Sequence, residues 1–366
     1  MAAQAPLVLI ATGGTGGHVY PALAVAVELL GRGYRVEWIG TRRGLEHRVV
    51  PAAGLRLHYL RVRGIRGKTV LHKLFGVFAA GFAVLRAAWL VLRRSPHCVV
   101  GLGGYVAGPV GVAAWLARKP LLVHEQNAVA GTTNRMLLRF ASRVLAGFPG
   151  AFCSAVECTV VGNPLRRELV EAAASASLDY DGTRPLRLLV LGGSLGAQPV
   201  NELMPGTVRR CEWDDRYRVE VLHQAGAAHA EGVRRRYGNL LGENVRVEPF
   251  IEDMAGAYRW ADLVLARAGA LTISELALMG LPSILVPLPH AIDDHQMANA
   301  RVLSSRGAAV VMHQGEMDAY KLCDLLRDYM ANPGKLAAMA RAAKAAAAPD
   351  AAERVCDCCE ELINAR

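Results

Sequence analysis

Short apolar runs alternate along the chain with longer segments in which large apolar residues recur at helical spacing. The short runs are rich in Val, Leu and Ile, which predicts buried strands, and the periodic segments predict helices. Strands that alternate with helices favour parallel sheets with helices on both faces, so the predicted fold class is α/β. The predicted strands are 7–10, 36–39, 99–102, 121–123, 144–146, 186–191, 219–222, 263–266 and 283–286.

The chain repeats its own beginning. At 7–17 an apolar run leads into a Gly-Gly-Thr-x-Gly loop, and at 188–196 a second run leads into Gly-Gly-Ser-x-Gly. A buried strand, a glycine loop and a helix in this order begin a Rossmann-like unit. We therefore expect two Rossmann-like domains that face each other across a cleft, with ligands at the carboxyl ends of the strands.

The segment between 148 and 185 is rich in turn formers and lacks a long strand, as expected of a linker. Pro349 interrupts an Ala-rich helix near the end of the chain, and the final stretch, 351–364, is expected to return to the first domain. The predicted domains are 1–164 with 343–366, and 165–342.

Composition narrows the class of protein. The chain has 366 residues, enough for two domains, and 52% hydrophobic residues, which excludes a disordered chain. Its eight Cys form no disulfide framework and no paired zinc motif, so reduced thiols are the simpler interpretation. A metal site at Cys356, Cys358 and Cys359 is the alternative. The N-terminus lacks the features of a signal peptide, which predicts a cytoplasmic location.

The net charge of +10 favours an anionic partner, such as nucleic acid, anionic lipid or a phosphorylated substrate. No basic tract with interleaved aromatic residues and no zinc finger is present in the sequence, so we expect no nucleic-acid partner.

Three glycine loops, at 13–17, 101–104 and 192–196, each follow a predicted strand. Glycines let the backbone approach a ligand, and the helix that follows offers N–H donors to a phosphate. The dinucleotide fingerprint fails, because Val19 stands where its third glycine is needed and the strand before Thr41 does not end in an acid. The loops therefore favour a nucleotide-sugar enzyme over a dehydrogenase; the alternative is tight turns needed only for packing.

Seven motifs occur in the same order as in a known family of transferases; they lie at 11–26, 103–109, 124–134, 162–166, 192–197, 267–275 and 290–300. Together they resemble the MurG-type transferases of peptidoglycan synthesis. The resemblance implies an inverting, metal-independent transfer of N-acetylglucosamine from UDP-N-acetylglucosamine to the C4 hydroxyl of the muramoyl sugar of lipid I, forming a β(1→4) disaccharide. It implies no cofactor, an acceptor site in the N-terminal domain, a donor site in the C-terminal domain, and a part in cell-wall growth, cell shape and division.

On the donor side, the helix after 192–196 is suited to holding a diphosphate, with a hydroxyl from Ser194 and a charge-assisted hydrogen bond from Arg166. Asp179-Tyr180-Asp181 has the form of a metal motif but lies in the linker, so we interpret it as a turn. Thr272 and Glu275 also fit a helix capping box, which is the alternative to nucleoside binding. The donor-binding residues that the resemblance implies are Thr15, Gly16, Gly17, Asn127, Arg166, Ser194, Ile251, Leu271, Thr272, Glu275 and Gln296.

On the acceptor side, the attacking hydroxyl must lose a proton, and His is the usual base near neutral pH. His18, at the tip of the first glycine loop, is one candidate base, and Glu125 is the other; a His18 that only caps or orients its helix is a third possibility. The acceptor-binding residues that the resemblance implies are Gly14, His18, Gly103, Gly104, Tyr105, His124 and Glu125.

The segment 74–92 is strongly apolar, but Arg86 interrupts it and leaves too short a run to cross a bilayer. Its bulky residues recur at helical spacing and basic residues lie on both sides of them, which favours a helix lying on anionic lipid at the cytoplasmic face of the membrane. An ordinary buried helix is the alternative. The predicted membrane residues are Leu74, Phe75, Phe78, Phe82 and Trp89.

Three other functions remain open at this point. A glycolipid synthase would use the same donor with a diacylglycerol acceptor, a UDP-sugar epimerase would need no acceptor, and a regulatory module would bind nucleotide without turnover. The expected partners are a UDP-sugar, an undecaprenyl-pyrophosphate-linked acceptor, an anionic membrane surface and other proteins of cell-wall synthesis.

Overall fold

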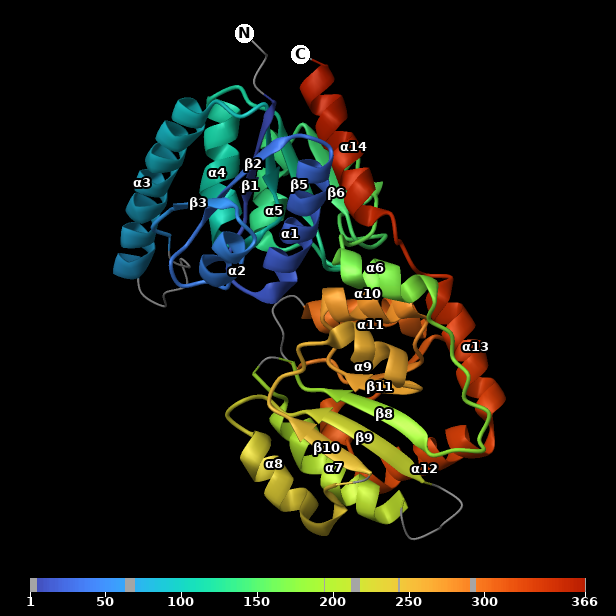
Figure 1. Ribbon diagram of the computed structural model, residues 1–366. Helices are drawn as coiled ribbons and strands as arrows, with labels where there is room; N and C mark the ends of the chain where they lie inside the picture. The colour runs from blue at the N-terminus through green and yellow to red at the C-terminus, as the bar shows by residue number, and fades with distance from the viewer. Residues whose placement is uncertain are drawn as a thin grey trace. The chain divides into compact units, whose positions relative to one another are not determined.

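The computed structural model describes residues 5–62, 70–193, 195–211, 218–242, 244–289 and 294–365, with only the backbone for 70–80. The chain divides into two compact units, residues 1–166 with 348–366, and residues 167–347 (Figure 1). Each unit is a parallel sheet covered by helices, which confirms the predicted α/β class and the two Rossmann-like units.

The first unit contains a sheet in the order β3-β2-β1-β4-β5-β6-β7, and every neighbouring pair is parallel. Its strands are β1 Leu7–Ala11, β2 Arg35–Gly40, β3 Arg56–Tyr59, β4 Cys98–Gly101, β5 Leu121–Glu125, β6 Arg143–Ala146 and β7 Thr159–Val160. Its helices are α1 Gly16–Gly31, α2 Glu46–Ala52, α3 Val70–Arg94, α4 Gly104–Leu116, α5 Thr132–Leu137 and α14 Ala351–Asn364, with a short 3-10 helix at Leu138–Phe140.

Alternate residues of β1 enter two different cores. Val8 and Ile10 pack with α1 and α14, whereas Leu9 and Ala11 pack with α3 and α4 on the other face. Because β1 is buried on both faces, its sequence is a continuous apolar run, as in other parallel sheets.

The C-terminal helix α14 returns to the first unit and lies beside α1 (Figure 1). Val355, Cys356 and Cys359 are fully buried in the core that it shares with α1. Burial raises the pKa of the Cys356 thiol to about 12, so this thiol stays protonated. No group of three or more metal-ligating side chains occurs among the described residues, and the two cysteines serve as core side chains.

The second unit contains a sheet in the order β10-β9-β8-β11-β12-β13, again parallel throughout. Its strands are β8 Leu186–Leu191, β9 Val219–Gln224, β10 Val245–Glu248, β11 Leu263–Ala266, β12 Ser283–Leu285 and β13 Ala309–Val311. Its helices are α6 Arg167–Ala174, α7 Gln198–Cys211, α8 Ala230–Tyr237, α9 Met254–Trp260, α10 Ala270–Met279, α11 His295–Ser304, α12 Ala319–Ala331 and α13 Pro333–Lys344, with 3-10 helices at Gly238–Leu240 and Gln314–Glu316.

Local sequence signals set the helix ends in this unit. Asp253 begins α9 by accepting a hydrogen bond from the Gly256 N–H at 2.8 Å, and Asp318 begins α12 in the same way. Gly280 ends α10 in the left-handed conformation, at φ +67°. Pro333 occupies the first turn of α13, where its missing N–H costs no helical hydrogen bond.

The segment Asp179-Tyr180-Asp181 is a turn and not a metal site. The Asp181 carboxylate accepts hydrogen bonds from the Thr183 N–H at 2.9 Å and from its hydroxyl at 2.7 Å. Asp179 pairs with Arg184 at 2.7 Å, so the two carboxylates face different partners.

Each sheet has one point at which the strand order reverses, and the loops there define the positions of the sites. In the first unit this switch point lies between β1 and β4, and in the second it lies between β8 and β11. The loops that leave two adjacent strands there turn to opposite faces of the sheet, which opens a crevice at the carboxyl ends of the strands. The three glycine loops predicted from the sequence follow β1, β4 and β8.

The C-terminal end of α3 is tied to the sheet by a buried ion pair. Arg94, the last residue of α3, donates two hydrogen bonds to the Glu37 carboxylate on β2, and the His58 ring lies 2.7 Å from the same carboxylate. Burial alone would raise the pKa of Glu37, but the hydrogen bonds from Arg94 and His58 outweigh it and hold this pKa below its usual value.

We predict that Arg94→Met lowers the free energy of unfolding by about 3 kcal/mol at neutral pH, because it leaves a buried carboxylate without its cation. Exposed Arg93→Met is the control and should cost less than about 0.5 kcal/mol. Because the pKa of Glu37 is lower in the folded state, its ion pair with Arg94 stabilises the fold above the unfolded-state pKa. This stabilisation is lost as the pH falls through the folded-state pKa. Urea titrations at several pH values measure this; equal costs for both variants would contradict it.

Candidate functional site

The loops after β1 and β4 touch each other at the switch point of the first unit. The Thr12 hydroxyl donates a hydrogen bond to the Gly103 carbonyl at 3.2 Å, and the Trp38 indole N–H donates to the Thr12 carbonyl at 2.9 Å. A Cβ atom on Gly104 would lie 2.5 Å from the Gly13 carbonyl oxygen. The two backbones therefore approach as closely as they do only because a glycine stands at 104.

His18 lies in the first turn of α1, with its ring against Gly103. A Cβ atom on Gly103 would lie 2.8 Å from His18 Cδ2 and 3.1 Å from Nε2, and Gly103 has φ +83°. His18 is half-buried. Gly14 and Gly17 are exposed beside it, as is Tyr105 in the first turn of α4. The structure thus gathers His18, Gly14, Gly103, Gly104 and Tyr105 at one edge of the sheet.

His124, at the end of β5, is placed differently. Its ring is fully buried, Nε2 lies 2.9 Å from the Gly162 carbonyl oxygen, and Nδ1 lies 3.4 Å from the Gln126 amide nitrogen. A carbonyl accepts hydrogen bonds, so Nε2 carries the proton and Nδ1 accepts. Burial lowers the pKa of His124 and keeps the ring neutral. His124 therefore braces the strand end and presents no exposed atom to an acceptor.

Glu125 is buried and fully engaged with four donors. Its Oε1 accepts from the Asn127 N–H at 2.9 Å and from the Asn127 amide at 3.0 Å. Its Oε2 accepts from the Gly131 N–H at 3.0 Å and from the Asn134 amide at 2.8 Å. These four hydrogen bonds occupy both oxygens and orient Asn127, whereas a base needs an open lone pair.

Arg166 belongs to the first unit, although the predicted boundary put it in the second. Its guanidinium lies over the ring of Tyr20 of α1, 5.4 Å from the ring centroid. Gly16 is the first residue of α1, and Thr15 is the residue before it. The Thr15 side chain makes no capping hydrogen bond to the helix.

In the second unit the glycine loop after β8 packs tightly on the end of β9. The Gly192 N–H donates to the Gln224 carbonyl at 3.1 Å, and a Cβ atom on Gly196 would lie 2.2 Å from the Ala225 carbonyl oxygen. Ser194 lies outside the described residues. The loop precedes α7, which starts at Gln198.

The loop after β11, on the other side of this switch point, is held by buried polar groups. Arg267 donates to the Val286 carbonyl at 3.1 Å and to the Gln314 side chain at 2.7 Å. The buried Asn299 amide donates to the Ala268 carbonyl at 3.1 Å. These contacts set the start of α10, which carries Leu271 and Thr272.

The capping-box interpretation of Thr272 and Glu275 is wrong. The residue that precedes α10 is Gly269, so Thr272 is the third residue of the helix and not its cap. Both side chains are half-buried, and Glu275 accepts a hydrogen bond from the Tyr258 hydroxyl at 2.8 Å. The nucleoside role that the resemblance implies for both residues stays a prediction.

Ile251 and Gln296, which are predicted to bind the donor, are held by hydrogen bonds that the sequence did not reveal. The Gln224 side-chain oxygen accepts from the Ile251 N–H at 3.1 Å, which fixes the loop after β10. The Gln296 side-chain oxygen accepts from the Leu288 N–H at 2.9 Å. Neither Gln224 nor Tyr258 belongs to one of the motifs found in the sequence. For Gln224, its place as a polar residue at the end of a strand could have indicated a role at the site.

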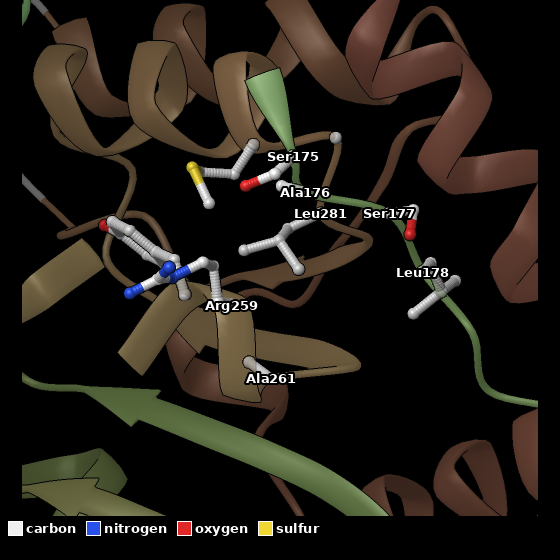
Figure 2. A pocket seen from close by; sticks show the side chains of 10 residues that line it. Ser175, Ala176, Ser177, Leu178, Arg259, Ala261 and Leu281 are labelled. Carbon is white, nitrogen blue, oxygen red and sulfur yellow. The ribbon is translucent and has the colours of Figure 1, made fainter. Parts of the chain in front are cut away.

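A cavity of about 100 Å³ is lined by residues of three segments, Ser175–Leu178, Tyr258–Ala261 and Met279–Leu281 (Figure 2). Nucleotide-sized ligands occupy pockets of about 300–1,000 Å³, so this cavity is too small for a sugar nucleotide.

Comparison with known proteins identifies the family. The model of the glycosyltransferase family 28 N-terminal domain matches residues 8–146, and that of the C-terminal domain matches residues 187–355. The chain belongs to glycosyltransferase family 28, in its MurG group.

Within this family, the chain is 51% identical over all of both chains to a protein of Pseudomonas putida (strain W619), and 51% identical to one of Stutzerimonas stutzeri (strain A1501) over 98% of this chain and 99% of the relative. Both are named UDP-N-acetylglucosamine--N-acetylmuramyl-(pentapeptide) pyrophosphoryl-undecaprenol N-acetylglucosamine transferase. The crystal structure of Acinetobacter baumannii MurG is similar at 39% identity and a TM-score of 0.83, over 97% of this chain and 99% of that one. A UDP-N-acetylglucosamine 2-epimerase of Listeria monocytogenes shares the fold alone, at 15% identity and a TM-score of 0.67.

We predict that Gly104→Ala lowers the free energy of unfolding by about 2 kcal/mol and abolishes most of the activity that depends on the first glycine loop. The added Cβ would meet the Gly13 carbonyl at 2.5 Å in a residue with φ +76°. Gly108→Ala in the same helix is the control, because its Cβ would meet Thr133 at an ordinary 3.5 Å. Thermal unfolding and turnover of the two variants measure the difference; indistinguishable variants would contradict the close approach.

Proposed function

We propose that the protein transfers N-acetylglucosamine from UDP-N-acetylglucosamine to the C4 hydroxyl of the muramoyl sugar of undecaprenyl-pyrophosphate-linked lipid I, with inversion, to form the β(1→4) disaccharide of lipid II. The observation that carries this proposal is identity of about half of all residues, over the full length, to enzymes named for that reaction. The epimerase alternative has only a shared fold in its favour.

The acceptor half of the reaction uses the edge of the first sheet. The acceptor diphosphate binds at Gly103, Gly104 and Tyr105, where the exposed start of α4 offers backbone donors. His18 accepts the proton of the attacking hydroxyl, because it is half-buried and its ring lies against Gly103 at this edge. Glu125, engaged with four donors, positions Asn127 for contact with the transferred sugar.

The donor half uses the switch point of the second unit. The loop Gly192–Gly196 and the start of α7 hold the diphosphate, Ile251 contacts the uracil, and Glu275 accepts hydrogen bonds from the ribose hydroxyls. Backbone N–H groups at the start of α7 stabilise the charge of the departing UDP, so no metal is required. Leu271, Thr272 and Gln296 complete the donor contacts.

We predict that His18→Ala lowers kcat for this transfer by about 10²–10⁴-fold, the usual contribution of a general base, and leaves UDP binding intact. Radiolabel transfer in EDTA is the measurement, and wild-type activity should persist there. Exposed His47→Ala is the control. Transfer to diacylglycerol in place of lipid I would identify a glycolipid synthase, and a fully active His18→Ala would remove His18 from the mechanism.

We further propose that the enzyme works on the cytoplasmic face of the membrane through α3. None of the helices in the described part of the chain is long and apolar enough to cross a bilayer. Phe82, Leu85, Trp89 and Leu92 expose 66, 70, 50 and 64% of their surface along α3. Ala83 and Ala87 are buried against the unit.

The surroundings of this exposed stripe support a lipid surface as its partner. Arg86 and Arg93 are exposed along the same helix, and bulky apolar residues with cations beside them suit anionic lipid. Trp115 and Leu116 are also exposed, at the end of α4, the helix that packs beside α3 (Figure 1). The predicted membrane residues Leu74, Phe75 and Phe78 lie where side chains are not described.

We predict that a triple variant, Phe82→Ser, Leu85→Ser and Trp89→Ser, binds vesicles of phosphatidylglycerol at least about tenfold more weakly, because it removes the exposed apolar side chains. Exposed Val27→Ser on α1 is the control. Vesicle co-sedimentation at low and high salt measures the binding, which salt should weaken. Unchanged binding of the triple variant would rule out this face of α3.

A further inference from the structure

A buried carboxylate lies directly beneath the first glycine loop. Glu46, the first residue of α2, has no exposed surface. Its Oε2 accepts a hydrogen bond from the Gly14 N–H at 2.9 Å, and its Oε1 accepts from the Thr41 N–H and from the Thr41 hydroxyl, each at 2.7 Å. A buried charge is stable only when it has such partners, so the carboxylate and the three donors depend on one another.

Three glycines make room for this carboxylate. A Cβ atom on Gly13, Gly40 or Gly44 would lie 2.4, 2.6 or 2.0 Å from an atom of the Glu46 side chain. These glycines come from the loop after β1, the end of β2 and the turn before α2, so the backbone of three segments is shaped around one side chain.

The turn that leads into α2 binds both the N–H and the carbonyl of Gly14. While Glu46 accepts from the Gly14 N–H, the Leu45 N–H donates to the Gly14 carbonyl at 3.0 Å. On its other side, the loop meets Gly104 at the Gly13 carbonyl. Gly14 has φ +114°, a conformation that only glycine adopts readily, and it is exposed. The loop therefore owes its shape to fixed hydrogen bonds and not to burial of its own side chains.

We propose that Glu46 is a positioning residue for transfer: its carboxylate fixes the Gly14 peptide, and through it the start of α1 and the ring of His18. The inference rests on the proposed function, because it assigns Glu46 an effect on the step that His18 serves. His18 follows Gly14 by four residues, and the His18 and Val19 N–H groups both donate to the Thr15 carbonyl, at 3.2 Å each. A shift of the Gly14 peptide thus passes directly into the first turn of α1.

The test compares Glu46→Gln with Thr41→Val. A glutamine offers one acceptor oxygen and one donating amide, so it cannot satisfy the Gly14 and Thr41 donors together. Thr41→Val removes the hydroxyl that donates to Glu46 and that accepts from the Gly44 N–H at 3.1 Å, but it leaves the contact between Glu46 and Gly14. It therefore controls for the loss of hydrogen bonds around Glu46 without freeing the loop. The measurements are kcat and KM for UDP-N-acetylglucosamine, and hydrogen–deuterium exchange of the peptide that spans 12–20.

We expect Glu46→Gln to lower kcat by about 10- to 100-fold, as a misplacement of about 1 Å does, with KM for the donor unchanged within about twofold. Exchange of the 12–20 peptide should be faster in Glu46→Gln than in Thr41→Val, whose kcat should stay near that of the wild type. If Glu46→Gln does not fold, Glu46→Asp keeps the charge but withdraws it by one methylene, and should show the same kcat and exchange effects in smaller measure.

Two results would overturn the inference: equal kcat for Glu46→Gln and Thr41→Val, or exchange of the 12–20 peptide that is the same in both. A wild-type protein that transfers no sugar would instead refute the proposed function. The exchange comparison still decides in that case whether Glu46 fixes the loop.

Discussion

The contact between Gly104 and the Gly13 carbonyl is the constraint on which the loops of the first unit depend. Two loops that leave adjacent strands meet backbone to backbone, and a Cβ at 104 would prevent it. Because the loops meet there, the His18 ring reaches Gly103, and Thr12 reaches the Gly103 carbonyl. The hydrogen bonds of Glu46 on the opposite side of the loop act on the same short segment.

Both units hold the loops at the carboxyl ends of their strands in place, but they do so with different polar groups. In the first, a carboxylate and buried His, Gln and Asn side chains hold the loops at the sheet edge. In the second, the loop after β8 is held largely by backbone carbonyls of the neighbouring strand, and the loop after β11 by Arg267 and Asn299. A hydrogen bond to a charged group is strong only while both groups stay buried and paired. Substitutions at these positions should therefore lower activity by more than their distance from the substrate suggests.

Central strands could be predicted from the sequence, and edge strands could not. All nine predicted runs are strands, because burial on both faces requires a continuous apolar run. The strands that were missed include β3, β10 and β13 at the edges of the sheets. In β10, Val245 and Val247 are buried while Arg246 and Glu248 are exposed, so only two apolar residues remain to signal a strand. The positions of the site loops could be predicted from the order of strands and helices, but the burial of individual polar side chains could not. His124 and Glu125 end the same strand, and both are buried.

Helix α14 has a consequence for how the protein is made. The second unit is one continuous stretch, 167–347, whereas the core of the first is completed by Val355, Cys356 and Cys359 from the last helix. On the ribosome, the first-synthesised half therefore lacks part of the core on the α1 face of its sheet until α14 has been made. Completion of the first unit therefore depends on synthesis of α14, and a chain that stops between the two would keep the second unit but leave the core of the first unit open.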